Sequence, residues 1–329
     1  MSISSYLYAM QVIEDKYGRT FKTLRVSLLS TCNLGCIYCV QGDESLKLTN
    51  GAHPATSLPL SELLDTIRRL HAQLDLDTVR LTGGEPLLYH DLIGMIAGIR
   101  DLGISHIKLT TNGFLLQRLA LPMKQAGMES VNVSLDAIGE EVFLQMSRRH
   151  SVQRILDGID AALDCGLEVK LNAVIMRGKN DSQILPLLNF AFSRNIRIRF
   201  LEIMAMGHLH DQADKYLFTR DEILREIGRQ YRFTPLDRLQ SSTAGYWKTG
   251  DGHVFGVIAN ESQPFCHDCN RLRLDSHGNI YGCLSDNHPI ALDKTDDENA
   301  LRLKLEEALS RKQALKFTGS ELSMLEIGG

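Results

Sequence analysis

Short β-rich runs alternate with amphipathic helical runs through the first two thirds of this chain. Between these runs apolar residues recur at three- and four-residue spacing, as from Leu60 to Leu74. Six strand–helix units in series predict an α/β fold with a parallel sheet and right-handed crossovers. The alternation leaves open whether that sheet is open, a full eight-stranded barrel or a partial one. The expected strands are residues 23–30, 77–82, 106–111, 129–135, 168–175 and 197–204.

The alternation ends near residue 205. A His- and Asp-rich stretch (GHLHDQADKY) follows, and the rest of the chain predicts a helix near 220–230, a turn-rich region at 236–285 and a helix near 297–312. We therefore expect two domains, at 1–205 and 206–329. The smaller second domain would carry the later cysteines.

Six of the seven cysteines form two triplets. The first triplet is Cys32, Cys36 and Cys39, and the second is Cys266, Cys269 and Cys283. Cys165 stands alone and is expected in the core. An odd count, and an N-terminus without the features of a secretory signal, argue against disulfides and predict a cytoplasmic protein.

Hydropathy and charge exclude two classes of partner. No apolar run approaches the roughly 20 residues of a membrane span. The net charge of −4 gives no indication of nucleic-acid binding.

The first triplet has the spacing C-x3-C-x2-C (CNLGCIYC) and directly follows the first expected strand. Three thiolates can hold three corners of an iron–sulfur cube, and no fourth cysteine is nearby, so one iron would stay open to an outside ligand. A structural zinc site would need four protein ligands, and no nearby histidine completes such a set.

The second triplet has the spacing C-x2-C-x13-C. By spacing alone, an iron–sulfur cluster with one open iron and a zinc site with His267 or another histidine as fourth ligand are about equally favoured. Arg271 and Arg273 follow at alternate positions, so an extended strand would place both on one face. Guanidinium pairs bind phosphate bidentately, which predicts a polyphosphate site; the alternative is two solvated surface arginines.

The CNLGCIYC stretch, with Tyr38 before its last cysteine, and Gly83-Gly84-Glu85-Pro86 resemble the signatures of the radical S-adenosylmethionine (SAM) superfamily. The resemblance implies a partial (β/α)6 barrel in which SAM binds the open iron and is cleaved to a 5′-deoxyadenosyl radical. The two glycines would let backbone approach the methionine end of SAM.

The run CxxCNRLRL, its distant third cysteine and the terminal Gly-Gly resemble the molybdenum cofactor biosynthesis protein A family. These enzymes are lyases with GTP 3′,8-cyclase activity, and they form (8S)-3′,8-cyclo-7,8-dihydroguanosine 5′-triphosphate. The resemblance implies two [4Fe-4S] clusters and SAM as cofactors. It also implies a flavodoxin- or ferredoxin-type electron donor, a downstream cyclic pyranopterin monophosphate synthase and a homodimer.

The same resemblance implies roles for single residues, and the implied SAM and GTP ligands would all lie at or beside the carboxyl ends of the expected strands or in the cluster loops. SAM would contact Tyr38, Gly84, Ser134 and Met204. Gly328 and Gly329 would enter the active site, although such a tail in isolation predicts fraying. Met204 could instead be core, and Ser134 and Thr111 could satisfy turn backbone. The implied GTP ligands are Arg25, Arg80, Thr111, Lys170, Arg271, Leu272 and Arg273.

Three segments depart from the family pattern without removing an expected ligand. They are Thr31 before the first cysteine, Val40-Gln41-Gly42 after the third, and Ala205-Met206-Gly207. Two other hypotheses remain at this point. One is a different two-cluster radical SAM enzyme, such as a peptide maturase, and the other is a non-catalytic iron–sulfur or zinc sensor.

Overall fold

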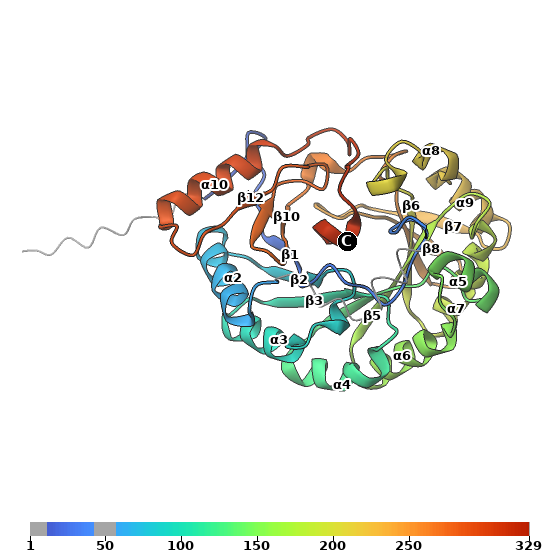
Figure 1. Cartoon of the computed structure of the whole chain (residues 1–329). Coiled ribbons are helices and arrows are strands. Elements are labelled where there is room, and N and C mark those ends of the chain that lie inside the picture. Colours follow the sequence, from blue (N-terminus) through green and yellow to red (C-terminus); the bar gives the residue numbers. More distant parts are fainter. Residues whose placement is uncertain (1–11, 43–56, 329) are drawn as a thin grey trace, which may run out of the picture.

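A single curved sheet organises the molecule. The computed structural model describes residues 12–42 and 57–328, and in these residues twelve strands follow the order β12-β11-β10-β1-β2-β3-β4-β5-β6-β9-β8-β7. The eight strands from β10 to β9 are parallel, and the outer strands are antiparallel. The strands curve into an arc, with helices along its outside (Figure 1).

The first six strands form the expected repeat. Their bounds are β1 (Thr23–Ser27), β2 (Thr78–Thr82), β3 (His106–Thr111), β4 (Ser130–Ser134), β5 (Glu168–Ile175) and β6 (Arg197–Glu202). The helices of this half are α2 (Leu60–Leu74), α3 (Leu92–Asp101), α4 (Leu116–Ala126), α5 (Glu140–Ser147), α6 (Val152–Asp164) and α7 (Ile184–Ser193). All six expected strands are confirmed to within three residues at each end.

Alternation along the strands separates the core from the inside of the arc. In β1, Leu24 and Val26 are fully buried, as are Val79 and Leu81 in β2, whereas Arg25, between the two buried β1 residues, lines a cavity inside the arc. Successive side chains of a strand point to opposite faces. The outer face therefore packs against the helices, and the inner face carries the polar residues.

The second half of the chain completes both edges of the arc. Its strands are β7 (Phe233–Leu236), β8 (Gly245–Thr249), β9 (Val254–Ile258), β10 (Arg271–Leu274), β11 (Asn279–Tyr281) and β12 (Ile290–Ala291). Its helices are α8 (Ala213–Tyr216), α9 (Arg220–Gly228), α10 (Glu298–Ser310) and α11 (Met324–Ile327). The region at 236–285 is rich in turns as expected, but it also contains all of β8–β11, which were not predicted.

The partial barrel is confirmed, with two parallel strands added to the expected six. β10 pairs with β1, and β9 pairs with β6. The expected domain boundary at 205/206 stays a prediction. None of the helices in the described part of the chain has the length and hydropathy of a membrane span.

Candidate active site

Both cysteine triplets line one cavity of about 600 Å³ inside the arc. The first triplet follows the carboxyl end of β1. Cys269 comes shortly before β10, which runs parallel to β1, and Cys283 comes shortly after β11, which is antiparallel to β10. The second triplet therefore lies at the amino ends of the parallel strands. The two triplets face each other from opposite ends of the cavity.

The cysteines of the first triplet are partly buried and lie close enough to repel one another as thiolates. Burial raises the pKa of Cys32 to about 12, and burial together with the neighbouring cysteines raises the pKa values of Cys36 and Cys39 well above the ordinary thiol value. Three thiolates so close together need a compensating positive charge, which the irons of a cluster provide. In the part of the chain that the structure describes, no three Cys, His, Asp or Glu side chains are placed to hold a single metal ion. This donor set, spread around a space, fits a cluster.

The glycines of the GGEP turn allow two backbones to meet. A Cβ on Gly84 would lie 2.2 Å from the Thr31 carbonyl oxygen, and one on Gly83 would lie 2.6 Å from that of Leu29. The Gly84 N–H donates to the Leu29 carbonyl at 2.7 Å. The approach of SAM to these glycines stays a prediction. In this structure the two glycines let the turn pack against the segment that leads into the first triplet.

The Glu85 side chain of the same turn is hydrogen-bonded to the carboxyl end of β3. Its carboxylate accepts hydrogen bonds from Thr111 Oγ1 at 2.6 Å and from the Asn112 N–H at 2.7 Å. Thr111 lies on the cavity wall as expected, but its hydroxyl donates to Glu85. Asn112, which sequence reasoning missed, donates weakly to Cys32 Sγ at 3.7 Å.

Burial raises the pKa of Glu85 from 4.5 to about 7, which predicts a pH-dependent stability. Between these values the unfolded chain has lost the proton and the folded chain keeps it, so stability falls as the pH rises, by at most about 3 kcal/mol for this group. We expect Glu85→Gln to have a flatter dependence. Urea unfolding of the apoprotein at pH 5 and pH 7.5 checks this, and parallel dependences in the two proteins would contradict it.

The four residues expected to contact SAM lie on the same cavity wall. Tyr38, Gly84, Ser134 and Met204 all line it. The Tyr38 hydroxyl donates to Asp136 at 2.7 Å, and burial raises the pKa of Asp136 to about 6. Asp136 was missed, although the NVSLD stretch places it just after an expected strand.

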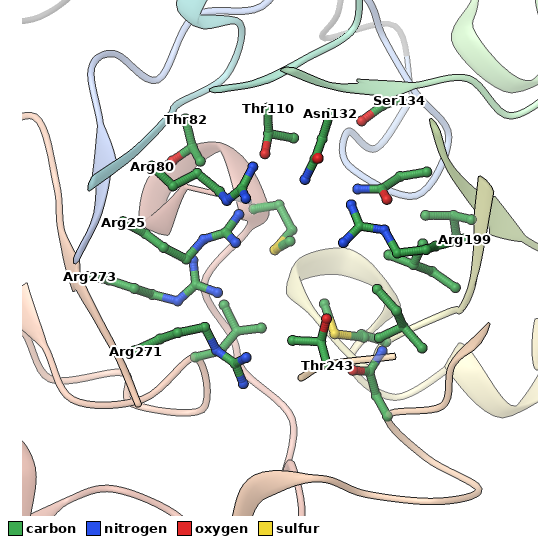
Figure 2. A pocket seen from close by; sticks show the side chains of 18 of the residues that line it. Arg25, Arg80, Thr82, Thr110, Asn132, Ser134, Arg199, Thr243, Arg271 and Arg273 are labelled. Carbon is green, nitrogen blue, oxygen red and sulfur yellow. The ribbon is translucent and has the colours of Figure 1, made fainter. Parts of the chain in front are cut away.

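Strand register gathers the arginines into a row. Arg25 on β1 is directly opposite Arg273 on β10 and Arg80 on β2. Burial and the neighbouring guanidinium groups lower the pKa of Arg25 well below its ordinary value, and burial above all lowers those of Arg80 and Arg273 to about 10. Figure 2 shows Arg25, Arg80, Arg271 and Arg273 reaching into the cavity from one side and Arg199 from the other.

The charges of most of these arginines are not compensated by ion pairs within the described residues. The ion pairs among the described residues include none of Arg80, Arg199, Arg271 and Arg273. Nε and Nη2 of Arg199 are buried and have no hydrogen-bond partner among the same residues. A buried donor without a partner is costly. Chemically, this arrangement of arginines can bind a strongly negative molecule.

Sequence reasoning missed three cavity cations, Lys108, Arg199 and Lys312. Lys108 and Arg199 lie on inner faces of expected strands, so strand alternation could have found these two. The expectation that Arg25, Arg80 and Lys170 lie at or beside carboxyl ends of strands was wrong. Arg25 and Arg80 are each the third residue of a five-residue strand, and Lys170 is the third residue of the eight-residue β5. The inner face of the arc, as well as its rim, carries the polar residues.

Three expected site residues in the described part of the chain do not line the cavity: Lys170, Leu272 and Gly328. Lys170 forms an ion pair with Glu168 at 2.9 Å and is absent from the residues that line the cavity. Leu272 is fully buried between the two arginines of β10. The carbonyl of Gly328 accepts a hydrogen bond from Arg273, which brings the tail to the arginine row. Gly329 lies outside the described residues.

The second triplet has positive neighbours. Burial alone would raise the pKa of Cys269, but Arg271 and Lys312 outweigh that effect and lower it to about 6. Burial and the two other thiols raise the pKa of Cys266 to about 11. Cys165 lies apart from both triplets, and its thiol donates to the Ala162 carbonyl at 3.3 Å.

An open β/α barrel with three cysteines after its first strand and a GGEP turn after its second defines the radical SAM class. Residues 26–191 match the radical SAM superfamily, and residues 196–318 match the Molybdenum Cofactor Synthesis C family. The chain is 38% identical over 282 residues to a GTP 3′,8-cyclase of Staphylococcus epidermidis, covering 83% of this chain and 82% of the relative. A GTP 3′,8-cyclase of Staphylococcus aureus is 38% identical over 283 residues, covering 84% and 82%. The chain belongs to the GTP 3′,8-cyclase family of radical SAM proteins.

Solved structures share the fold at low sequence identity. Streptococcus suis SuiB bound to precursor peptide SuiA has a TM-score of 0.64 at 14% identity, covering 89% of this chain and 67% of that one. The protein anSMEcpe with bound AdoMet has a TM-score of 0.60 at 13% identity, covering 88% and 84%.

Proposed function

We propose that this protein is a GTP 3′,8-cyclase that converts GTP to (8S)-3′,8-cyclo-7,8-dihydroguanosine 5′-triphosphate, the first step of molybdenum cofactor biosynthesis. One observation carries the proposal: two cysteine triplets face each other across a single cavity whose walls hold five arginines. A different two-cluster radical SAM enzyme would not need this concentration of positive charge.

The residues of the first triplet fit a [4Fe-4S] cluster with SAM on its open iron. When bound, these groups supply the 5′-deoxyadenosyl radical, to which hydrogen at C3′ of the GTP ribose is the expected donor. Tyr38, Gly84, Ser134 and Met204 would hold SAM against the wall of the cavity. The hydrogen bond from Tyr38 to Asp136 fixes the orientation of the phenol ring.

The arginines would bind the triphosphate. GTP carries about four negative charges, and Arg25, Arg80, Arg199, Arg271 and Arg273 together offset them although the whole chain is acidic. Because these side chains come from β10, β1, β2 and β6, they would hold the triphosphate from several directions and fix the ribose. Lys170 is proposed as a further ligand only if its pair with Glu168 opens.

The second triplet would hold a second [4Fe-4S] cluster, whose open iron would bind the guanine. Since the two triplets lie at opposite ends of the cavity, a nucleotide held between them would present its ribose toward the SAM end. Gly328 and Gly329 would close the cavity beside the triphosphate and exclude water.

We further propose a domain division at residue 205, a cytoplasmic location and a homodimer. The proposed partners are a flavodoxin- or ferredoxin-type electron donor and a cyclic pyranopterin monophosphate synthase that acts on the product.

Anaerobic turnover tests the proposed function. Protein reconstituted with iron and sulfide is incubated with SAM, dithionite and GTP, and 5′-deoxyadenosine and nucleotides are measured by mass spectrometry. We expect 5′-deoxyadenosine together with a cyclised nucleotide. Formation of 5′-deoxyadenosine without GTP consumption would indicate another radical SAM substrate. If protein that carries about eight irons per chain formed no 5′-deoxyadenosine, the result would favour a non-catalytic iron–sulfur sensor.

Arg273→Ala is expected to weaken GTP binding by about tenfold to a hundredfold, the effect of removing one buried charge-assisted contact. Both clusters and SAM cleavage should remain. Equilibrium dialysis with labelled GTP measures the change. Arg197→Ala is the matched control, because Arg197 is exposed on β6 and does not line the cavity. Equal effects of the two substitutions, or loss of iron in Arg273→Ala, would contradict the phosphate role.

A further inference from the structure

Lys312 is a buried lysine beside the second triplet that has no role in the function proposed so far. It follows α10, is 4% exposed and lines the same cavity as Cys266, Cys269 and Cys283. None of the ion pairs formed by residues 12–42 and 57–328 includes it. Its ammonium group lies over the ring of Phe21, 5.0 Å from the centroid. A buried ammonium is costly unless nearby negative charge compensates it.

The hydrogen bonds of Lys312 join the two segments that carry the cysteines. Nζ donates to the Arg271 carbonyl at 2.7 Å and to the Gly282 carbonyl at 2.7 Å. Arg271 begins β10 just after Cys269, and Gly282 directly precedes Cys283. One ammonium group therefore sets the separation between the second and third cysteines of the triplet.

Arg19 holds the remaining cysteine in a comparable way, but with a different charge balance. Its Nη1 donates to the Cys266 carbonyl at 2.6 Å, while its Nη2 pairs with Asp15 at 2.5 Å. The charge of Arg19 is thus already compensated. The side chains whose negative charge would offset that of Lys312 are Cys269 and Cys283.

We propose that Lys312 is the positioning residue of the second triplet: it spaces Cys269 and Cys283 and supplies the buried positive charge that stabilises an anionic cluster there. This inference rests on the proposed second cluster. Positive charge beside a cluster favours its reduced form, because reduction adds negative charge. Lys312 would therefore raise the reduction potential of the cluster as well as favour its assembly.

The test isolates the second cluster in the full-length chain. A parent variant with Cys32→Ala, Cys36→Ala and Cys39→Ala leaves only the second triplet to bind iron. Lys312→Met, Lys312→Gln and Lys312→Arg are made in this parent, with Lys304→Met as matched control. Lys304 lies on α10 and pairs with Asp296 at 2.7 Å, away from the cysteines. Iron and sulfide per chain are measured, and the midpoint potential is followed by electron paramagnetic resonance.

We expect Lys312→Met and Lys312→Gln to bind less iron and to hold a cluster of more negative potential, whereas Lys312→Arg and Lys304→Met resemble the parent. Complete loss of the cluster in the Met and Gln variants, with retention in Lys312→Arg, would also support the proposal. An unchanged potential in both neutral variants would overturn it. A parent that binds no iron would overturn the second cluster and this inference together, whereas GTP turnover in the wild type tests the enzyme function separately.

Discussion

Replacing Cys36 by alanine will abolish 5′-deoxyadenosine formation, and with it all conversion of GTP. Cys36 lies in the middle of the first triplet, partly buried beside the two other thiols. Two thiolates hold only two corners of the cube, so SAM would lose the open iron on which its cleavage depends. Anaerobic reconstitution followed by mass spectrometry of 5′-deoxyadenosine, normalised to iron content, measures the effect.

The contrasting variant is Cys283→Ala, at the opposite end of the cavity. We expect it to keep SAM cleavage and to lose the cyclised nucleotide, because only the proposed second cluster would be removed. Cys165→Ala controls for loss of a thiol as such, since that cysteine lies outside the cavity. If Cys36→Ala still formed 5′-deoxyadenosine, or if Cys165→Ala matched either loss, the assignment of the triplets would be contradicted.

Gly328→Ala is expected to reduce formation of the cyclised nucleotide by about a hundredfold while SAM cleavage continues. Gly328 has a φ of +80°, and a Cβ there would lie 2.7 Å from Thr82 Oγ1 and 2.8 Å from Ser27 Cβ. The tail would have to move away from the carboxyl ends of β1 and β2, and the hydrogen bond from Arg273 to the Gly328 carbonyl would be lost. Displacements of about 1 Å near a reacting centre have effects of this size. The ratio of cyclised nucleotide to 5′-deoxyadenosine is the measurement.

Gly166→Ala separates steric contact from backbone strain. Gly166 also has a positive φ, +77°, but a Cβ there would meet nothing within 4 Å. It should cost about 1 kcal/mol of stability and leave the product ratio unchanged. A normal ratio in Gly328→Ala would show that the tail does not act at the cavity.

Local patterns predicted the barrel half of the fold well. Strand alternation and helical periodicity are short-range signals, and His106–Thr111 and Glu168–Ile175 were predicted to the residue. The strands within 236–285 were not predicted because they are short, and two of them, β10 and β9, pair with β1 and β6, which are distant in sequence. Their formation depends on tertiary contacts more than on local propensity.

By itself the sequence determined the chemistry available to this protein: six thiols in two triplets, a GGEP turn, paired arginines and a Gly-Gly tail. Those features depend on residue identity and local spacing, which the chain carries directly. Only the tertiary structure decided that the triplets face each other across one cavity. It also placed Arg25 between Arg80 and Arg273. The same arrangement adds Arg199 to the cavity wall and pairs Lys170 with Glu168. The physical reason is that parallel pairing of β10 with β1 brings residues some 250 positions apart into register, and no local pattern encodes that pairing.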